Sequence, residues 1–227
     1  MTSSNKEVTS NASNTEKTKD VTPRNAPVQG RSKLRSKQII DVTGELLERV
    51  GLDDLNTILI AKEVGISIGS LYHYFPNKHA ILYAMAMRWL DEIEAVLNEF
   101  EAWPIETMDF DELIVRLLKT NLKVYKKQKA ILTLVQAMFS VPELRQLDEQ
   151  HDELVIKKMA QVFKRMGITH HLKERERLAR VYLEATHSLF LVVVNQKGER
   201  AKRSLNDLNL MIKSLLKTYL EDENHNQ

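Results

Sequence analysis

The chain of 227 residues contains no cysteine, which excludes disulfide bonds, iron–sulfur clusters and thiolate zinc sites. It also lacks any run of about eighteen apolar residues, so we expect no membrane-spanning helix. Residues 1–17 have no apolar segment of the kind that a secretory signal needs, and we therefore expect a cytoplasmic protein. The net charge is only +2, so a nucleic-acid partner is indicated only if charge is concentrated locally.

Glycine and proline are also scarce, with seven and five residues, and this favours helices over turn-rich strands. Residues 1–30 are mostly Ser, Thr, Asn, Lys and Glu, a composition typical of a disordered tail. The rest of the chain shows helical periodicity between breakers, which predicts an all-α protein. The expected helices span about 35–50, 57–64, 68–75, 78–100, 109–126, 128–139, 143–166, 172–196 and 203–220.

The most informative stretch is residues 56–78, which has the spacing of a helix-turn-helix. Two helices that cross steeply need a small residue where their backbones meet, here Ala61, and a residue tolerant of positive φ in the turn, here Gly65. Ile60, Ile66 and Leu71 can face one another across this corner. Such a corner presents its second helix outward, and an outward helix can enter the major groove of DNA.

Side chains that can cap helices mark the same stretch. Asn56 precedes the second helix, Ser67 precedes the third, and Asn77 follows Pro76 before the fourth helix begins at Lys78. On the third helix, Leu71 and Phe75 lie four residues apart and take the buried face, so the three residues between them, Tyr72, His73 and Tyr74, point outward. Three exposed rings favour contact with DNA, although they are also compatible with an ordinary surface.

These residues resemble a known family. The segment from Ser32 to about Leu82 is similar to the DNA-binding domain of TetR-type transcriptional repressors, through Gly51, Ile60-Ala61, Gly65-Ile66-Ser67, Leu71-Tyr72, Tyr74-Phe75 and Asn77-Lys78. The resemblance implies nine helices, binding of a double-stranded DNA operator by a dimer, and release when a small molecule enters the C-terminal domain. It divides the chain into a tail (1–30), a helix-turn-helix domain (31–78), a helical regulatory and dimerisation domain (79–221) and a C-terminal tail (222–227).

The resemblance also assigns roles by position. Ser67 to Ser70 would lie over base edges, Tyr72 and Tyr74 would reach phosphates, and Lys78 would contact phosphate from the first turn of its helix. Ile68 is apolar where the family often has a polar residue, so it would suit a thymine methyl group rather than guanine. Ile58 and Leu59 depart in the same way. The expected DNA-binding residues are Asn56, Thr57, Ser67, Ile68, Gly69, Ser70, Tyr72, His73, Tyr74, Lys78, Arg31, Lys33 and Arg35.

The last three of these belong to a basic run at residues 31–37. This run is either a solvated tail or an arm that follows the minor groove or the DNA backbone, and the sequence leaves both open.

The helix expected at 172–196 is unusual because residues 189–194 (LFLVVV) are apolar on every side. Such a helix must be covered on more than one face. We predict a symmetric homodimer built on this helix and the next, over about 172–220. The alternative is a helix buried at the centre of a monomer.

Candidate contacts for a lipophilic effector are Met85, Trp89, Tyr125, Gln136, Phe139 and His187, each of which is also compatible with plain core. Gln136 interrupts an apolar run, and His187 could pair with Glu184. The resemblance to TetR-type repressors implies a ligand-responsive regulator, most simply a repressor. The alternatives are an activator or ligand-independent regulator of the same fold, and a helical ligand-binding or interaction protein that has lost DNA binding.

Two patterns suggest other chemistry. Residues 65–69 match the G-x-S-x-G elbow of hydrolases, but that motif needs a preceding strand, and AKEV is the end of a helix. His151-Asp152 and His170-His171 suggest a metal site, but neighbours on a helix point about 100° apart, and we interpret them as surface residues. We therefore expect no enzyme activity, no cofactor and no bound metal.

Overall fold

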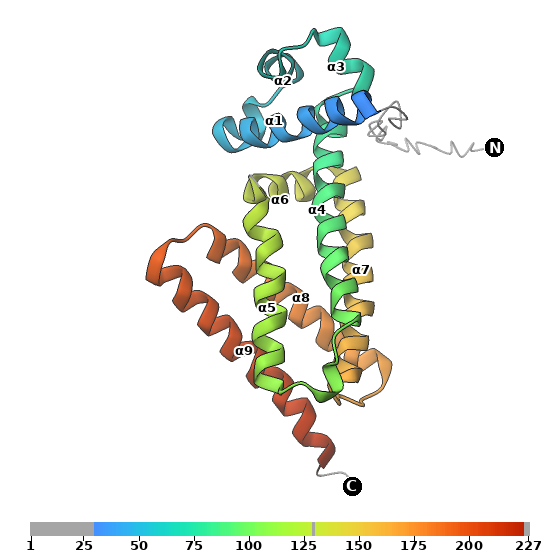
Figure 1. Cartoon of the computed structure of the whole chain (residues 1–227), viewed down its shortest axis with the longest axis vertical. Coiled ribbons are helices and arrows are strands. Elements are labelled where there is room, and N and C mark those ends of the chain that lie inside the picture. The colour runs from blue at the N-terminus through green and yellow to red at the C-terminus, as the bar shows by residue number, and fades with distance from the viewer. Residues whose placement is uncertain (1–29, 129, 225–227) are drawn as a thin grey trace, which may run out of the picture.

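The structure is a computed structural model that describes residues 30–128 and 130–224. Over these residues it contains nine α-helices, one short 3-10 helix and no strand, which confirms the all-α prediction (Figure 1). Within the same ranges, no helix has the length and apolarity needed to cross a membrane. The elements are α1 (Gly30–Asp54), α2 (Thr57–Val64), α3 (Ile68–Tyr74), α4 (Lys78–Glu101), η1 (Ile105–Thr107), α5 (Phe110–Lys127), α6 (Ile131–Ser140), α7 (Pro142–Arg165), α8 (Leu172–Val194) and α9 (Gly198–Asn224).

The first three helices form an N-terminal unit at one end of the molecule (Figure 1). Ile39, Leu46 and Leu47 of α1 are fully buried, and Ile60 and Leu71 are buried with them. α1 begins at Gly30, five residues earlier than expected, because the Lys, Arg and Gln side chains of its first turns are good helix formers. At its far end the helix is interrupted at Gly51, whose φ of 77° only glycine adopts readily.

α4 joins this unit to the rest of the chain. Its 24 residues extend over about 36 Å at the usual rise. Ala80 and Leu82 near its start are fully buried, as are Met85 and Phe100 further along. α1 packs against both α4 and α6, and an ion pair of 2.6 Å between Asp41 and Arg88 links α1 to α4. These contacts connect the N-terminal helices to the bundle.

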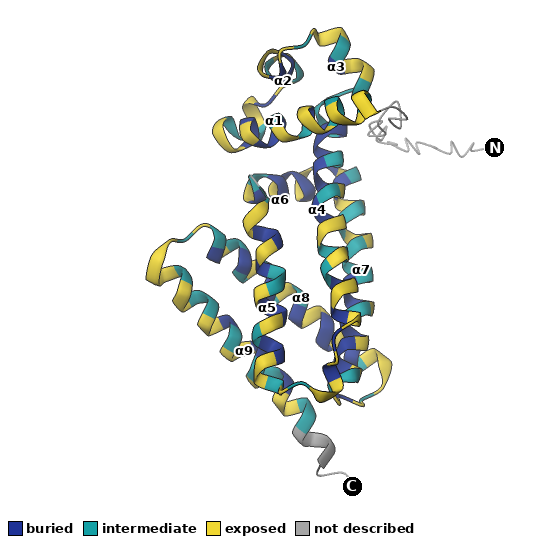
Figure 2. Ribbon diagram, in the orientation of Figure 1, coloured by how far each residue is buried: buried dark blue, intermediate teal, exposed yellow. Residues whose placement is uncertain are grey.

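The remaining helices form a bundle in which α4, α5, α7 and α8 surround a buried core, and α9 lies along α8 and α5 (Figures 1 and 2). Several boundaries differ from expectation: α6 begins at Ile131 rather than at 128, α8 ends at Val194 rather than at 196, and α7 and α9 begin earlier than expected. Pro142 is the first residue of α7, where its missing N–H costs nothing. Gly198 opens α9 five residues early, since its φ of 59° makes a tight turn and the next five residues favour helix.

Candidate DNA-binding surface and candidate ligand cavity

The corner between α2 and α3 has the geometry that its spacing predicted. Gly65 has a φ of 74°, its N–H donates to the carbonyl of Lys62 at 3.1 Å, and the Ile66 N–H donates to that of Ala61 at 3.0 Å. These two bonds form a Schellman motif, which satisfies the last carbonyls of α2 while it turns the chain. Ala61 and Leu71 are buried at the crossing. The orientation of α3 is thus determined locally.

The three expected caps are confirmed. Asn56 Oδ1 accepts from the Leu59 N–H at 2.9 Å, Ser67 Oγ from the Ser70 N–H at 3.1 Å, and Asn77 Oδ1 from the Ala80 N–H at 2.9 Å. The Ser67 hydroxyl therefore acts as a helix cap, and the element before it is α2. The strand that a hydrolase elbow requires is missing at this point.

The outward side of α3 combines apolar and aromatic groups. Ile68 is 38% exposed and Tyr72 is 40% exposed, while Ile58 of α2 is 71% exposed. The Tyr72 hydroxyl lies 3.1 Å from Thr57 Oγ1, which ties the two helices together. Gly69 and His73 are also exposed, and Ser70 is half-buried.

Tyr74 departs from the expected outward orientation. It is half-buried and packs against the core, with its ring edge-on to His73 at 5.5 Å. Tyr74 is the last residue of α3 and directly precedes the fully buried Phe75.

The Lys78 ammonium group, which the sequence predicted to contact phosphate, already forms hydrogen bonds within the protein. Its Nζ donates to the carbonyl oxygens of Leu52 and Leu55, at 3.1 and 3.0 Å. These carbonyls lie at the end of α1 and in the short segment that leads to α2. The ammonium group of Lys78 therefore links this segment to the start of α4. One of its three N–H donors remains for another acceptor.

The basic run is helical rather than extended. Arg31 and Lys33 are exposed in the first turns of α1, and Arg35 donates to Gln38 at 2.9 Å. Residues 31–37 are therefore part of α1, and their contact with DNA stays a prediction. Of the predicted tail, 1–30, residue 30 opens this helix and residues 1–29 lie outside the described residues.

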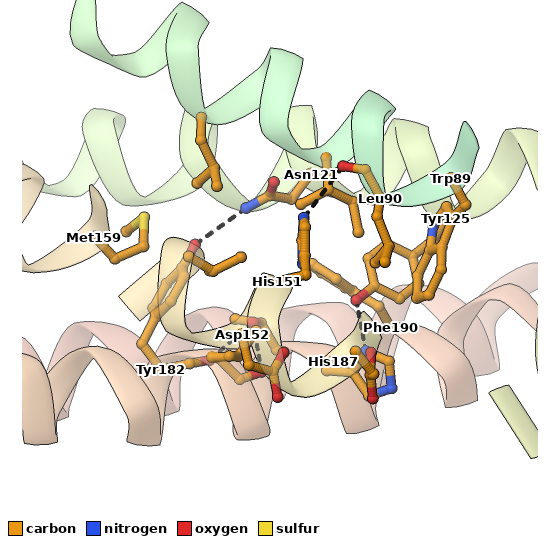
Figure 3. A pocket seen from close by; sticks show the side chains of 16 residues that line it. Trp89, Leu90, Asn121, Tyr125, His151, Asp152, Met159, Tyr182, His187 and Phe190 are labelled. Atoms are coloured by element: carbon orange, nitrogen blue, oxygen red, sulfur yellow. Dashed lines mark hydrogen bonds between the residues drawn. The ribbon is translucent and has the colours of Figure 1, made fainter. Parts of the chain in front are cut away.

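The bundle contains a cavity of about 40 Å³ between α4, α5, α7 and α8 (Figure 3). Of the six predicted effector contacts, Trp89, Tyr125 and His187 line it. Met85 is fully buried but does not reach it, and Phe139 is 59% exposed on α6. Gln136 is also exposed, so the interpretation of Gln136 as a buried polar group was wrong.

Aromatic rings gather at one end of the cavity (Figure 3). The Trp89 and Tyr125 rings are perpendicular at 5.6 Å, and the Tyr125 and Phe190 rings lie 5.1 Å apart. The Tyr125 hydroxyl is 2.8 Å from His187 Nδ1, so His187 pairs with this tyrosine rather than with Glu184. Burial raises the pKa of Tyr125 and lowers that of His187, so the hydroxyl stays protonated and the imidazole neutral near pH 7.

Sequence reasoning missed the polar side of the cavity. Asp148 and Asp152 line it from α7, and burial is the main cause that raises their pKa values, to about 6 and about 7. The signal was available: residues 148, 152, 155 and 159 follow one helical stripe, and Val155 and Met159 are buried.

His151 lies within the same cavity. It is half-buried, and its Nε2 is 3.2 Å from the Leu90 carbonyl oxygen, so the surface interpretation was wrong for this residue. Over the described ranges, no three potential ligands among His, Asp and Glu are placed to hold a metal ion.

The predicted dimer helices expose apolar side chains. Val192 of α8 is 43% exposed, and Leu210 and Met211 of α9 are exposed as well. Val193, in contrast, is only 4% exposed and packs inside the protomer. The apolar run of α8 is therefore divided between the core and the surface.

Comparisons with known proteins match both halves of the chain. The family of bacterial regulatory proteins, tetR family, matches residues 39–85, and the tetracyclin repressor-like C-terminal domain matches residues 109–216. A curated relative, the HTH-type transcriptional regulator BetI of Escherichia coli, is 35% identical over 79 residues, 34% of this chain. That match spans 40% of the length of BetI.

Solved structures with low sequence identity share the fold. A transcriptional regulator from Rhodococcus sp. Rha1 has a TM-score of 0.62 at 17% identity, over 82% of this chain and 96% of the other. Salmonella enterica GusR has a TM-score of 0.62 at 20% identity, over 81% of this chain and 96% of the other. With two family models that together cover most of the described residues, the chain belongs to the TetR family of DNA-binding transcriptional regulators.

Proposed function

We propose that this regulator is a cytoplasmic repressor that binds a palindromic operator as a homodimer and leaves it when a small molecule enters the bundle cavity. The observation that carries the proposal is the preformed corner at Gly65, which presents the exposed side of α3 away from the protein. In a symmetric dimer, two such helices enter successive major grooves when their separation is near one DNA turn, about 34–36 Å, or a multiple of it.

Within each half-site, the groups divide into those that read sequence and those that fix position. Ile68 offers methyl groups to thymine, and Ser70 offers a hydroxyl to base edges. The hydroxyls of Tyr72 and Tyr74, with the N-terminus of α4, suit phosphate oxygens. Because the carbonyls of Leu52 and Leu55 already occupy two donors of Lys78, its phosphate contact relies on the third.

The dimer is supported by the exposed apolar side chains of α8 and α9. Single exposed apolar residues are ordinary, but Val181 and Val192 on α8 and Leu210 and Met211 on α9 belong to two helices that pack together. Burying these side chains against a second copy would also fix the distance between the two DNA-reading units.

The size of the cavity supports the proposed release by a ligand. A space of about 40 Å³ has room for water but not for an organic molecule, so a ligand must move the lining helices apart. One of these helices is α4, which carries the N-terminal unit. A coupling of about 1–3 kcal/mol between ligand and DNA binding is enough for regulation.

The test begins with selection of bound fragments from random duplex DNA, followed by footprinting. We expect two half-sites in inverted order, centred about one helical turn or a multiple apart. Ile68→Ala and Ser70→Ala should change the selected sequence more than the overall affinity, whereas Lys157→Ala, on the exposed side of α7, should change neither. If Ile68→Ala and Ser70→Ala weakened the binding of every DNA sequence equally, base readout by α3 would be contradicted.

A transcription reporter placed behind the selected site distinguishes the regulatory roles. Repression that is lost in the Ile68→Ala variant supports the proposal. Increased transcription would instead identify an activator of the same fold.

A further inference from the structure

Positive charge compensates the carboxylates of the cavity only weakly. Over the described residues, neither Asp148 nor Asp152 forms an ion pair within 4.0 Å. The charge of Arg180 lowers the pKa of Asp152, but burial and the neighbouring carboxylates outweigh this effect, and Arg180 also lies 4.0 Å from the exposed Glu153. Glu184 adds a further negative charge next to both aspartates. The buried imidazoles cannot balance this charge, because burial lowers the pKa values of His151 and His187 and keeps both rings neutral near pH 7.

The other side of the same cavity is aromatic. Trp89, Tyr125 and Phe190 are each almost fully buried, and all three line the space that Asp148 and Asp152 also line (Figure 3). Aromatic faces attract a desolvated cation by about 2 kcal/mol, and tryptophan is the most effective of them. Aromatic rings and unpaired carboxylates thus favour the same charge in a ligand.

One further group in the cavity is unsatisfied. The Trp89 indole N–H is buried, in a side chain that is 2% exposed, and among residues 30–128 and 130–224 it has no hydrogen-bond partner. A buried donor of this kind costs free energy until it meets an acceptor. The indole nitrogen can only donate, so the acceptor must come from a ligand or from water.

We propose that the cavity binds an organic cation that carries a hydrogen-bond acceptor close to its charge, with Asp148 and Asp152 facing the positive group, the rings of Trp89 and Tyr125 covering it, and the Trp89 indole donating to the acceptor. This inference rests on the proposed function, because it names the chemical class of the molecule that releases the operator. Anionic effectors are repelled by the same carboxylates, and neutral ones gain no attraction from them.

The experiment uses two probes of the same shape. Phenacyltrimethylammonium carries a carbonyl acceptor and a positive charge, and neopentyl phenyl ketone replaces its charged nitrogen with carbon. The affinity of each probe is measured by calorimetry. Quenching of Trp89 fluorescence shows whether a probe binds in the cavity, and it is measured in a protein in which Trp103, the only other tryptophan in the sequence, is changed to Phe.

We expect the full chain to bind the cation at least tenfold more tightly than the ketone. Asp148→Asn with Asp152→Asn should remove this preference while leaving ketone binding unchanged. Glu99→Gln, on the exposed side of α4, is the matched control and should keep the preference. Equal affinities for the two probes in the unmodified chain, or a preference that survives the double substitution, would overturn the proposal.

Adding selected operator DNA to the same titrations separates this inference from the function on which it rests. Cation binding that leaves the DNA complex intact supports the ligand class but contradicts release by a ligand. Release of DNA by the ketone as readily as by the cation supports ligand release but overturns the ligand class. Thermal unfolding of each variant confirms that the aspartate substitutions leave the fold intact.

Discussion

The N-terminal unit and the bundle cavity differ in whether their polar groups find partners within the chain. In the first, Asn56, Ser67 and Asn77 each accept a hydrogen bond from a backbone N–H three residues later, so the helix ends are satisfied within the chain. In the second, within the part of the chain that the structure describes, the Trp89 indole has no acceptor and Asp152 forms no ion pair within 4.0 Å. The helix caps of the first region are thus satisfied without a binding partner, whereas polar groups of the second region are not.

This difference corresponds to what each region has to do. A surface that reads a rigid duplex gains affinity when its shape is fixed before binding, because less order is lost on contact. A cavity that couples ligand binding to a movement needs groups that are satisfied in only one of its states. Substitutions in the two regions should therefore have different consequences.

The largest effect is expected where core and surface meet on α8. Val193→Glu places a charge inside the protomer and should destabilise the fold by about 3–5 kcal/mol. Its exposed neighbour offers the matched change: Val192→Glu should leave the helical content intact and yield monomers in sedimentation. A stable dimer of the Val192→Glu protein would contradict the interface on α8.

How far the sequence predicted each region depends on the range of the interactions. The corner, the caps and the buried pair Leu71 and Phe75 lie within about twenty residues of one another, and local spacing was enough to place them. The cavity joins Trp89, Tyr125 and Asp152 from three different helices. No local pattern determines how those helices pack, so the sequence could suggest such residues only one by one.

A second effect tests whether the corner is fixed by backbone conformation. A methyl group at Gly65 would meet no atom within 4 Å, yet its φ of 74° is unfavourable for alanine. Gly65→Ala should therefore lower stability by about 1–2 kcal/mol, measured by urea unfolding. Gly69→Ala is the control, because this glycine is helical and equally unobstructed, and the change should stabilise by about 0.5–1 kcal/mol. Equal effects at both sites would refute a conformational role for Gly65.

In the cavity, by contrast, a substitution should stabilise the protein, because it replaces a buried carboxylate with a neutral group. The pKa of Asp152 is raised to about 7 in the folded state from an ordinary value of 3.8, so the folded chain holds this proton more tightly than the unfolded chain. The stability that the proton provides is present at pH 4 and lost as the pH rises to about 7. Asp152→Asn should raise Tm by a few degrees at pH 8 and much less at pH 4. Glu99→Gln, exposed on α4, should not show this pH dependence. A Tm that falls at pH 8 in the Asp152→Asn protein would contradict the account.

Some errors came from single residues whose surroundings the sequence does not reveal. Gln136 interrupts an apolar run, yet α6 turns it outward, and His151 looks like a surface residue, yet α7 turns it toward α4. In both cases the helix was predicted and its rotation about its own axis was not. Neighbouring buried positions determine that rotation, as the stripe through Val155 and Met159 shows for Asp152.

The smallest effect concerns the contact that joins the two regions. Asp41 on α1 and Arg88 on α4 form an ion pair of 2.6 Å, but both side chains are more than a third exposed. Such pairs contribute about 0–1 kcal/mol, so a double-mutant cycle with Asp41→Ala and Arg88→Ala should give a coupling energy in that range that falls with added salt. The pair formed by Glu199 and Lys202 within α9 is the control for an ion pair that joins no two helices. A coupling energy well above this range would mean that the ion pair, rather than the apolar packing of α1 on α4, holds the N-terminal unit in its orientation on the bundle. That orientation would then depend on a side chain of the bundle as well as on the hydrogen bonds within the unit.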